Sequence, residues 1–196
     1  MKNDSPAKDV AKRMDGAIIG IKGTAGLRLL GSMKILGIDP GLKATGFGVI
    51  DLDGNGRITP LDVGTIEPRV KDSLEMKLFK IHKLLGEIIA KHSPDVVVLE
   101  KLFTHSAHPV TAAIMGHTRG VICLLCVERK VQLVHYSVKR IRKSVVGNGN
   151  ANKEQTRRVV ANILKVDPQR LTYDASDALA LALGHASMNR IGQLCK

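Results

Sequence analysis

One short stretch near residue 34 restricts the fold of this chain more than any other. An apolar run at residues 34–38 ends in Asp39, a Pro-Gly turn follows at 40–41, and a second β-like run with two glycines occupies residues 44–50. This pattern predicts two adjacent strands joined by a tight turn, with glycines that let another element approach the backbone closely. Asp39 then ends a buried strand, where a carboxylate either bonds to turn amides or anchors a cation or a phosphate.

Length and charge indicate a single globular domain with a basic surface. The 196 residues suit one domain with a substantial core, and 44% hydrophobic residues indicate a globular chain. The formal net charge is +12, of which residues 1–32 contribute +3, so the remainder of the chain is itself basic. A basic domain suits a polyanionic partner such as nucleic acid and argues against an enzyme of small neutral metabolites.

The region before the first strand differs from the rest of the chain. Residues 1–32 show no strand pattern, no secretory signal and no transit peptide, and Met33 directly precedes the first strand. We expect an N-terminal extension at 1–32, either poorly ordered or upstream of the true start, one domain at 33–190 and a tail at 191–196. Three cysteines and the lack of an apolar run of about 20 residues predict a soluble, cytoplasmic protein with no membrane partner.

The periodicity of apolar residues predicts a sheet covered by helices. Strand patterns occupy residues 34–39, 46–51, 57–66, 95–100 and 131–136, and helical patterns occupy 71–92, 107–129, 152–165 and a last segment that starts near Asp174. A short basic amphipathic segment lies at 138–145. The first three strands are antiparallel, whereas the continuous β-branched run at 95–100 is typical of a strand buried on both faces. This order indicates an α/β fold with a mixed five-stranded sheet flanked by helices.

Three further carboxylates fall where they can join Asp39. Glu100 closes its strand as Asp39 closes the first, and open α/β sheets bind ligands at the carboxyl ends of their strands. Asp174 and Asp177 share one face of the first turn of the last predicted helix. The backbone dipole stabilises acids at any helix N-terminus, but the rest of this helix is apolar nearly all round. Two inward-facing acids on a buried helix need a cation.

Four converging carboxylates without a Cys or His ligand pattern suit hard cations, Mg²⁺ or Mn²⁺. Two such ions about 4 Å apart activate a water on one side of a phosphodiester and stabilise the leaving oxygen on the other. The acids therefore predict metal-dependent hydrolysis of a nucleic-acid strand.

Four segments carry a resemblance to a known family. They are ILGIDPG at residues 35–41, VLEKLF at 98–103, VVGNGNANK at 145–153 and DASDALA at 174–180. In order and spacing they resemble the bacterial RuvC Holliday-junction resolvases over about residues 33–188. The family's catalytic acids match Asp39, Glu100, Asp174 and Asp177, and residues 1–32 lie outside the family pattern.

The resemblance implies a ribonuclease H-like fold and a homodimer that makes paired cuts in strands of like polarity at a four-way DNA junction, in recombination and repair. It also implies Mg²⁺ as cofactor, with Mn²⁺ as a substitute and two ions per active site. The branch-migration proteins RuvA and RuvB are the partners it implies. We expect the Ala-rich helix at 107–129 to help form the dimer, because small residues allow close approach.

Basic and aromatic residues near the acids are candidate DNA contacts. Arg142 and Lys153 match basic DNA-contacting positions of the family, and we expect them to contact mainly phosphates. Phe103, three residues after Glu100, either packs in the core or stacks on bases at the crossover, as the family's aromatic does. Cys123 and Cys126 form a Cys-x-x-Cys pair, which we interpret as buried apolar thiols rather than a metal or redox motif.

Other functions stay open at the level of sequence. The first segment also resembles the phosphate loop of actin-like and sugar-kinase ATPases, although a second phosphate loop and a second lobe are missing. A junction-binding scaffold without catalysis is the non-enzymatic alternative, but four clustered acids without metal cost on the order of several kcal/mol. A ribonuclease H-like nuclease that acts on RNA or on other branched DNA has the same sequence features as a junction resolvase.

Overall fold

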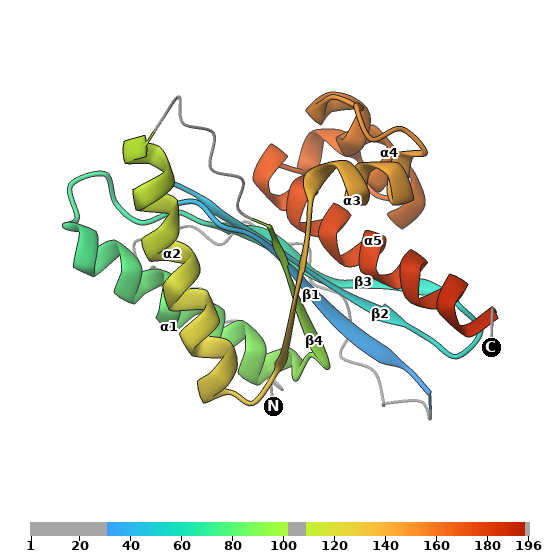
Figure 1. Cartoon of the computed structure of the whole chain (residues 1–196), viewed down its shortest axis with the longest axis horizontal. Helices are drawn as coiled ribbons and strands as arrows, with labels where there is room; N and C mark the ends of the chain where they lie inside the picture. The colour runs from blue at the N-terminus through green and yellow to red at the C-terminus, as the bar shows by residue number, and fades with distance from the viewer. Residues whose placement is uncertain (1–30, 102–108, 195–196) are drawn as a thin grey trace, which may run out of the picture.

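The protein forms three layers, with one sheet between two groups of helices (Figure 1). The computed structural model describes residues 31–101 and 109–194. The strands are β1 (Met33–Asp39), β2 (Thr45–Leu52), β3 (Ile58–Ile66), β4 (Val96–Glu100) and β5 (Gln132–Tyr136). The helices are α1 (Leu74–His92), α2 (Pro109–Glu128), α3 (Val138–Val146), α4 (Lys153–Leu164) and α5 (Tyr173–Leu194), with a 3-10 turn, η1 (Pro168–Arg170), before the last.

The sheet is mixed, and its strands lie in the order β3-β2-β1-β4-β5. β1, β2 and β3 pair antiparallel, while β1, β4 and β5 pair parallel. The predicted α/β fold with a mixed five-stranded sheet is therefore confirmed. Because β1, β4 and β5 run in the same direction, their carboxyl ends meet at one edge of the sheet.

Alternating side chains divide the core into two halves. Leu36, Ile38 and Leu99 pack toward α1 and α2 on one face of the sheet. Ile35 and Val98, one position away along their strands, pack toward α3, α4 and α5 on the other face. Figure 1 shows these two helix groups on opposite sides of the sheet. Side chains alternate along a strand, so a residue two positions after Ile35 on β1 or after Val98 on β4 must also face α5.

Three glycines, which we call the glycine floor, let α5 rest directly on the sheet. They are Gly37 on β1 and Gly46 and Gly48 on β2, and Gly37 pairs with Gly48 across the two strands. A Cβ atom on Gly37 would overlap the carbonyl oxygen of Ala178, and one on Gly46 would overlap that of Asp174. The close approach predicted for this glycine-containing run is thus made by α5.

The structure departs from the sequence prediction in small details. Residues 138–146 form a true helix, in which Ser137 accepts a hydrogen bond from the Arg140 amide and Gly147 ends the last turn at φ +80°. The 3-10 turn η1 was not predicted. Cys126 is buried as expected, but Cys123 is only half-buried. No helix within the described residues is long and apolar enough to cross a membrane. The N-terminal extension expected at residues 1–32 lies outside the described residues, apart from residues 31 and 32.

Candidate active site

The parallel pairing of β1 with β4 brings two acids together. Ile38 pairs with Leu99, so Asp39 and Glu100, the last residues of the two strands, are neighbours. Both acids lie two residues beyond positions that face α5, and they face α5 as well. The position of each carboxylate thus follows from the strand period and from the register of one strand pair.

The first turn of α5 supplies the other two acids. Thr172 holds this turn in place, because its hydroxyl accepts a hydrogen bond from the Ala175 amide (3.1 Å) and contacts the Thr65 hydroxyl of β3 (2.8 Å). The glycine floor lets the same turn lie close above β1 and β2. Asp174 and Asp177 are therefore held over the carboxyl end of β1.

One pocket of about 360 Å³ collects these side chains at the carboxyl edge of the sheet. It is lined by the four acids, by two basic residues and by residues of α2, α3, α4 and α5: Asp39, Glu100, Asp174, Asp177, Arg142, Lys153, Met115, Val138, Ile141, Thr156, Ala180 and Leu181, together with Pro40, Gly41 and Ala44. Six of the seven predicted site residues thus line a single pocket. Phe103, the seventh, lies outside the described residues.

Burial and mutual repulsion change the ionisation of the acids. The pKa of Asp39 rises from 3.8 to about 7, first because the side chain is desolvated and then because the Asp177, Glu100 and Asp174 carboxylates repel its charge. Burial is also the main cause of the raised pKa of Glu100 and of Asp177. The pocket therefore holds more negative charge than it stabilises by itself.

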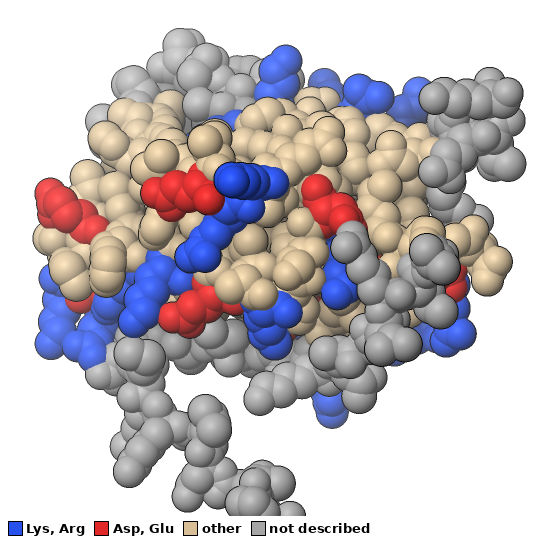
Figure 2. Space-filling model, turned by 90° about the horizontal axis from the view of Figure 1, so that it is seen from below, with Lys and Arg blue, Asp and Glu red and all other residues tan. Residues whose placement is uncertain are grey.

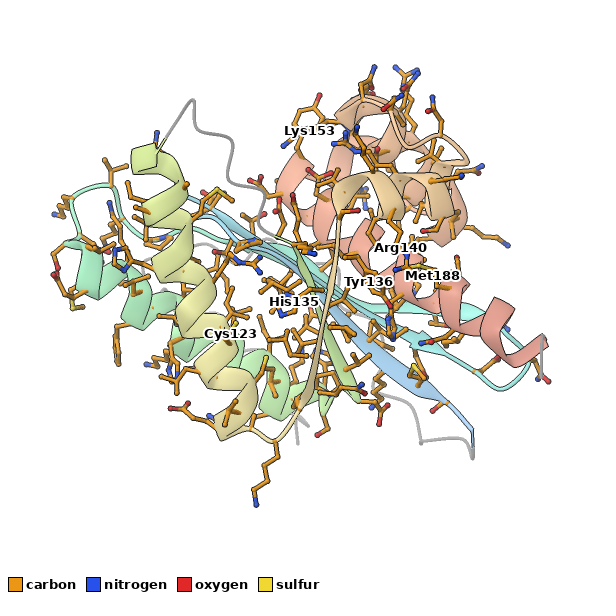
Figure 3. All side chains as sticks on the ribbon, viewed as in Figure 1. Cys123, His135, Tyr136, Arg140, Lys153 and Met188 are labelled. Carbon is orange, nitrogen blue, oxygen red and sulfur yellow. The ribbon has the colours of Figure 1, made fainter. Side chains whose placement is uncertain are left out.

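Two basic side chains offset part of this charge. The Lys153 ammonium lies 3.3 Å from an Asp177 carboxylate oxygen. Burial lowers the pKa of Lys153, but Asp177, Asp39 and Asp174 raise it by more, so the pKa is raised overall. Arg142 lowers the pKa of Glu100 and of Asp177 against the effect of burial. Figure 3 shows Lys153 beside the first turn of α5.

The donor set fits a hard divalent cation. Within residues 31–101 and 109–194, no three His, Cys, Asp or Glu side chains stand close enough, as placed, to hold a metal ion. However, four carboxylates and only two basic side chains line the pocket, and this excess of negative charge matches a divalent cation. Carboxylate oxygens are also the ligands that Mg²⁺ and Mn²⁺ prefer. Small side-chain movements toward a cation would relieve the repulsion that raises the pKa of Asp39.

Sequence analysis did not single out Arg119 of α2. Its guanidinium donates a hydrogen bond to the backbone carbonyl oxygen of Glu100 and contacts Nδ1 of His135 at 3.3 Å. One signal was available, since Arg119 is the only Lys, Arg, Asp or Glu between Lys101 and Glu128. An isolated charge in an apolar helix needs a specific partner.

Comparison with known proteins agrees with the geometry. The family model described as "Crossover junction endodeoxyribonuclease RuvC" matches residues 35–185. A protein of that name from Rhodopirellula baltica is 42% identical over 156 residues, which cover 79% of this chain and 87% of the relative. Another from Azorhizobium caulinodans is 38% identical over 157 residues, 80% of this chain and 90% of the relative.

A solved structure shares the fold as well. The Thermus thermophilus RuvC structure superposes with a TM-score of 0.73 at 27% sequence identity, covering 82% of this chain and 97% of that chain. The predicted ribonuclease H-like fold is confirmed by this likeness and by the mixed five-stranded sheet. Because the family model matches most of the length of the chain, the chain belongs to the RuvC family of crossover junction endodeoxyribonucleases.

Proposed function

We propose that this protein is an endonuclease that resolves four-way (Holliday) DNA junctions in recombination and repair by metal-dependent hydrolysis of phosphodiesters. One observation carries the proposal: Asp39, Glu100, Asp174 and Asp177, from three separate segments, line one pocket. The chain belongs to a family whose members are named for cutting crossover junctions. A scaffold without catalysis would gain nothing from an acidic pocket that destabilises its own charges.

The four acids would hold the cations, and we assign Mg²⁺, two per pocket, with Mn²⁺ as a substitute. Bound divalent ions would supply charge stabilisation to the phosphate and lower the pKa of a water. With a pKa of about 7, the Asp39 carboxyl group is still partly protonated at neutral pH, and a bound cation would displace that proton. Metal uptake should therefore release protons.

Lys153 and Arg142 provide the positive charge that the substrate phosphate needs. Lys153 is 57% exposed, so its ammonium can leave Asp177 and contact a phosphate oxygen. Arg142 lines the same pocket from α3, where its planar guanidinium suits two phosphate oxygens at once. We assign both side chains to binding the DNA backbone at the cut site.

The DNA path continues over α3 and α4. These helices carry seven basic residues on the two sides of the loop at residues 147–152: Lys139, Arg140, Arg142, Lys143, Lys153, Arg157 and Arg158. On the face drawn in Figure 2, by contrast, basic and acidic side chains are interspersed. We keep Phe103 as the candidate that stacks on bases, because it follows Glu100 by three residues.

We propose that a second copy of the chain binds at an exposed stripe on α2. This α2 stripe is formed by Gly116, Gly120, Leu124 and Val127. These residues recur at helical spacing, Leu124 is 56% and Val127 76% exposed, and a Cβ atom on either glycine would meet open space. Small and apolar side chains on one helix face suit a symmetric contact with the same helix of a partner. Two pockets related by a two-fold axis suit paired cuts. RuvA and RuvB as further partners rest on the family resemblance.

The test is cleavage of a labelled synthetic four-way junction with Mg²⁺. We expect paired, symmetric nicks from the natural protein, and a loss of cutting of roughly 10²-fold or more in Glu100→Gln, with junction binding kept. Glu87→Gln, which changes an exposed glutamate on α1, is the matched control and should cut normally.

A linear duplex, a branched RNA and a nucleotide-binding titration separate the alternatives. Equal cutting of linear duplex, or preferred cutting of RNA, would leave a nuclease with another substrate. If the natural protein and Glu100→Gln both bind the junction and neither cuts it, the result would favour the scaffold. Binding of ATP would favour the ATPase.

A further inference from the structure

We propose that Arg119 of α2 is a positioning residue that fixes the carboxyl end of β4 and thereby orients Glu100. The inference rests on the proposed function, because it gives Glu100 a role at the metal. Arg119 does not line the pocket, and its contact with Glu100 is to the backbone.

Arg119 joins the ends of two strands. One terminal nitrogen of its guanidinium donates to the Glu100 carbonyl oxygen of β4, and the other lies 3.3 Å from Nδ1 of His135 on β5. His135 pairs with Leu99, so the two acceptors belong to adjacent strands. A planar guanidinium with two separate nitrogens spans this gap, which a single ammonium does not.

The contact comes from the face of the sheet opposite to the one toward which the Glu100 carboxylate points. α2 covers the face of the sheet that carries Leu99, whereas the Glu100 carboxylate points to the face covered by α5. Figure 3 shows the same alternation on β5, with His135 on the side of α2 and Tyr136 on the side of α5 and Arg140. Arg119 therefore binds the Glu100 backbone from the face of the sheet that α2 covers. The Glu100 carboxylate, on the other face, stays free for the pocket.

The contact between Arg119 and Glu100 lies at the last residue of β4, where the pairing of β4 with β5 ends. The Lys101 amide donates to the Tyr136 carbonyl at 2.7 Å, just as β4 ends. The Glu100 carbonyl takes its hydrogen bond from a charged donor, a stronger type of bond than the neutral ones of the ladder.

The experiment compares Arg119→Met and Arg119→Lys with the natural protein. Arg129→Met is the control, since this arginine follows the end of the same helix and is exposed. Isothermal titration with Mn²⁺ in the absence of DNA should show a loss of affinity of roughly 10-fold for Arg119→Met and a smaller loss for Arg119→Lys. On the junction, kcat should fall while KM stays unchanged. Arg129→Met should behave as the natural protein in both assays.

Natural Mn²⁺ affinity and natural kcat in Arg119→Met would overturn the inference. If Arg119→Met does not fold, as judged by near-UV circular dichroism, the decision passes to Arg119→Lys, and natural affinity in that variant would overturn the inference equally. Failure of the proposed function looks different, because the natural protein would then bind Mn²⁺ in an Arg119-dependent way and cut no junction.

Discussion

At the scale of single residues, Asp39 shows how the site opposes stability. In the unfolded chain its carboxyl group releases its proton near pH 3.8, and in the folded metal-free protein only near pH 7. Between these values the folded state binds the extra proton. The free energy of unfolding therefore falls as the pH rises from about 4 to about 7, and the loss is complete above the folded pKa.

Replacement of Asp39 should relieve this cost. We expect Asp39→Asn to raise the free energy of unfolding of the metal-free protein by roughly 1–3 kcal/mol at pH 8, and by little at pH 4, because the amide carries no charge. Urea unfolding in EDTA at the two pH values measures the effect, with Glu87→Gln as the control. Equal stability of Asp39→Asn and the natural protein at pH 8 would contradict it.

At the scale of elements, the glycine floor sets the height of α5 above the sheet. The helix backbone lies where a methyl group on Gly37 would be, and both the strand and the helix are parts of the core. An added Cβ therefore has to lift the first turns of α5, which carry Asp174 and Asp177.

Gly37→Ala should thus cost both stability and activity. We expect a loss of about 1–3 kcal/mol in the free energy of unfolding and a weaker Mn²⁺ affinity, since overpacking in a rigid core forces the backbone to shift. Gly54→Ala in the β2–β3 turn is the matched control, because its Cβ would meet only Gly31 O at 3.9 Å. A Gly37→Ala protein that matches this control in both assays would show that α5 does not rest on the floor.

Local patterns predict the elements well, but not every contact between them. Strand period and strand ends were enough to predict Asp39 and Glu100 as neighbours, and the glycines predicted a close approach. The hydrogen bond from Arg119 to Glu100 joins residues 19 positions apart in the sequence. Its acceptor is a backbone carbonyl, so no local pattern encodes it. The same holds for the buried contact of His92 with Asp62 (2.8 Å), which ties α1 to β3.

At the scale of the whole molecule, the α2 stripe should decide the oligomeric state. We expect Leu124→Glu to be monomeric at micromolar concentration, because a buried charge opposes the apolar contact, and to make single rather than paired nicks. Sedimentation velocity measures the first effect. Phe79→Glu removes another exposed apolar side chain, 58% exposed on α1, and should remain dimeric. Dimers of Leu124→Glu would place the contact elsewhere.

The basic surface should show itself in the salt dependence of junction binding. Removal of one phosphate contact lowers the slope of log K against log salt by about 0.9. We expect this change for Arg142→Ala and for Lys153→Ala, measured by fluorescence anisotropy in EDTA at several salt concentrations. Lys83→Ala, on α1, should leave the slope unchanged. An unchanged slope in the first two variants would remove them from the DNA path.

The order of the elements along the chain has a consequence for synthesis. The ribosome makes the glycine floor early, in β1 and β2, and makes α5, the helix that covers the floor and carries Asp174 and Asp177, last of the described elements. Until α5 emerges, a nascent chain has neither a closed core on that face nor a complete acidic pocket. Folding of this half of the core and completion of the acidic pocket therefore come together, and we expect a chain that ends before α5 to cut no DNA.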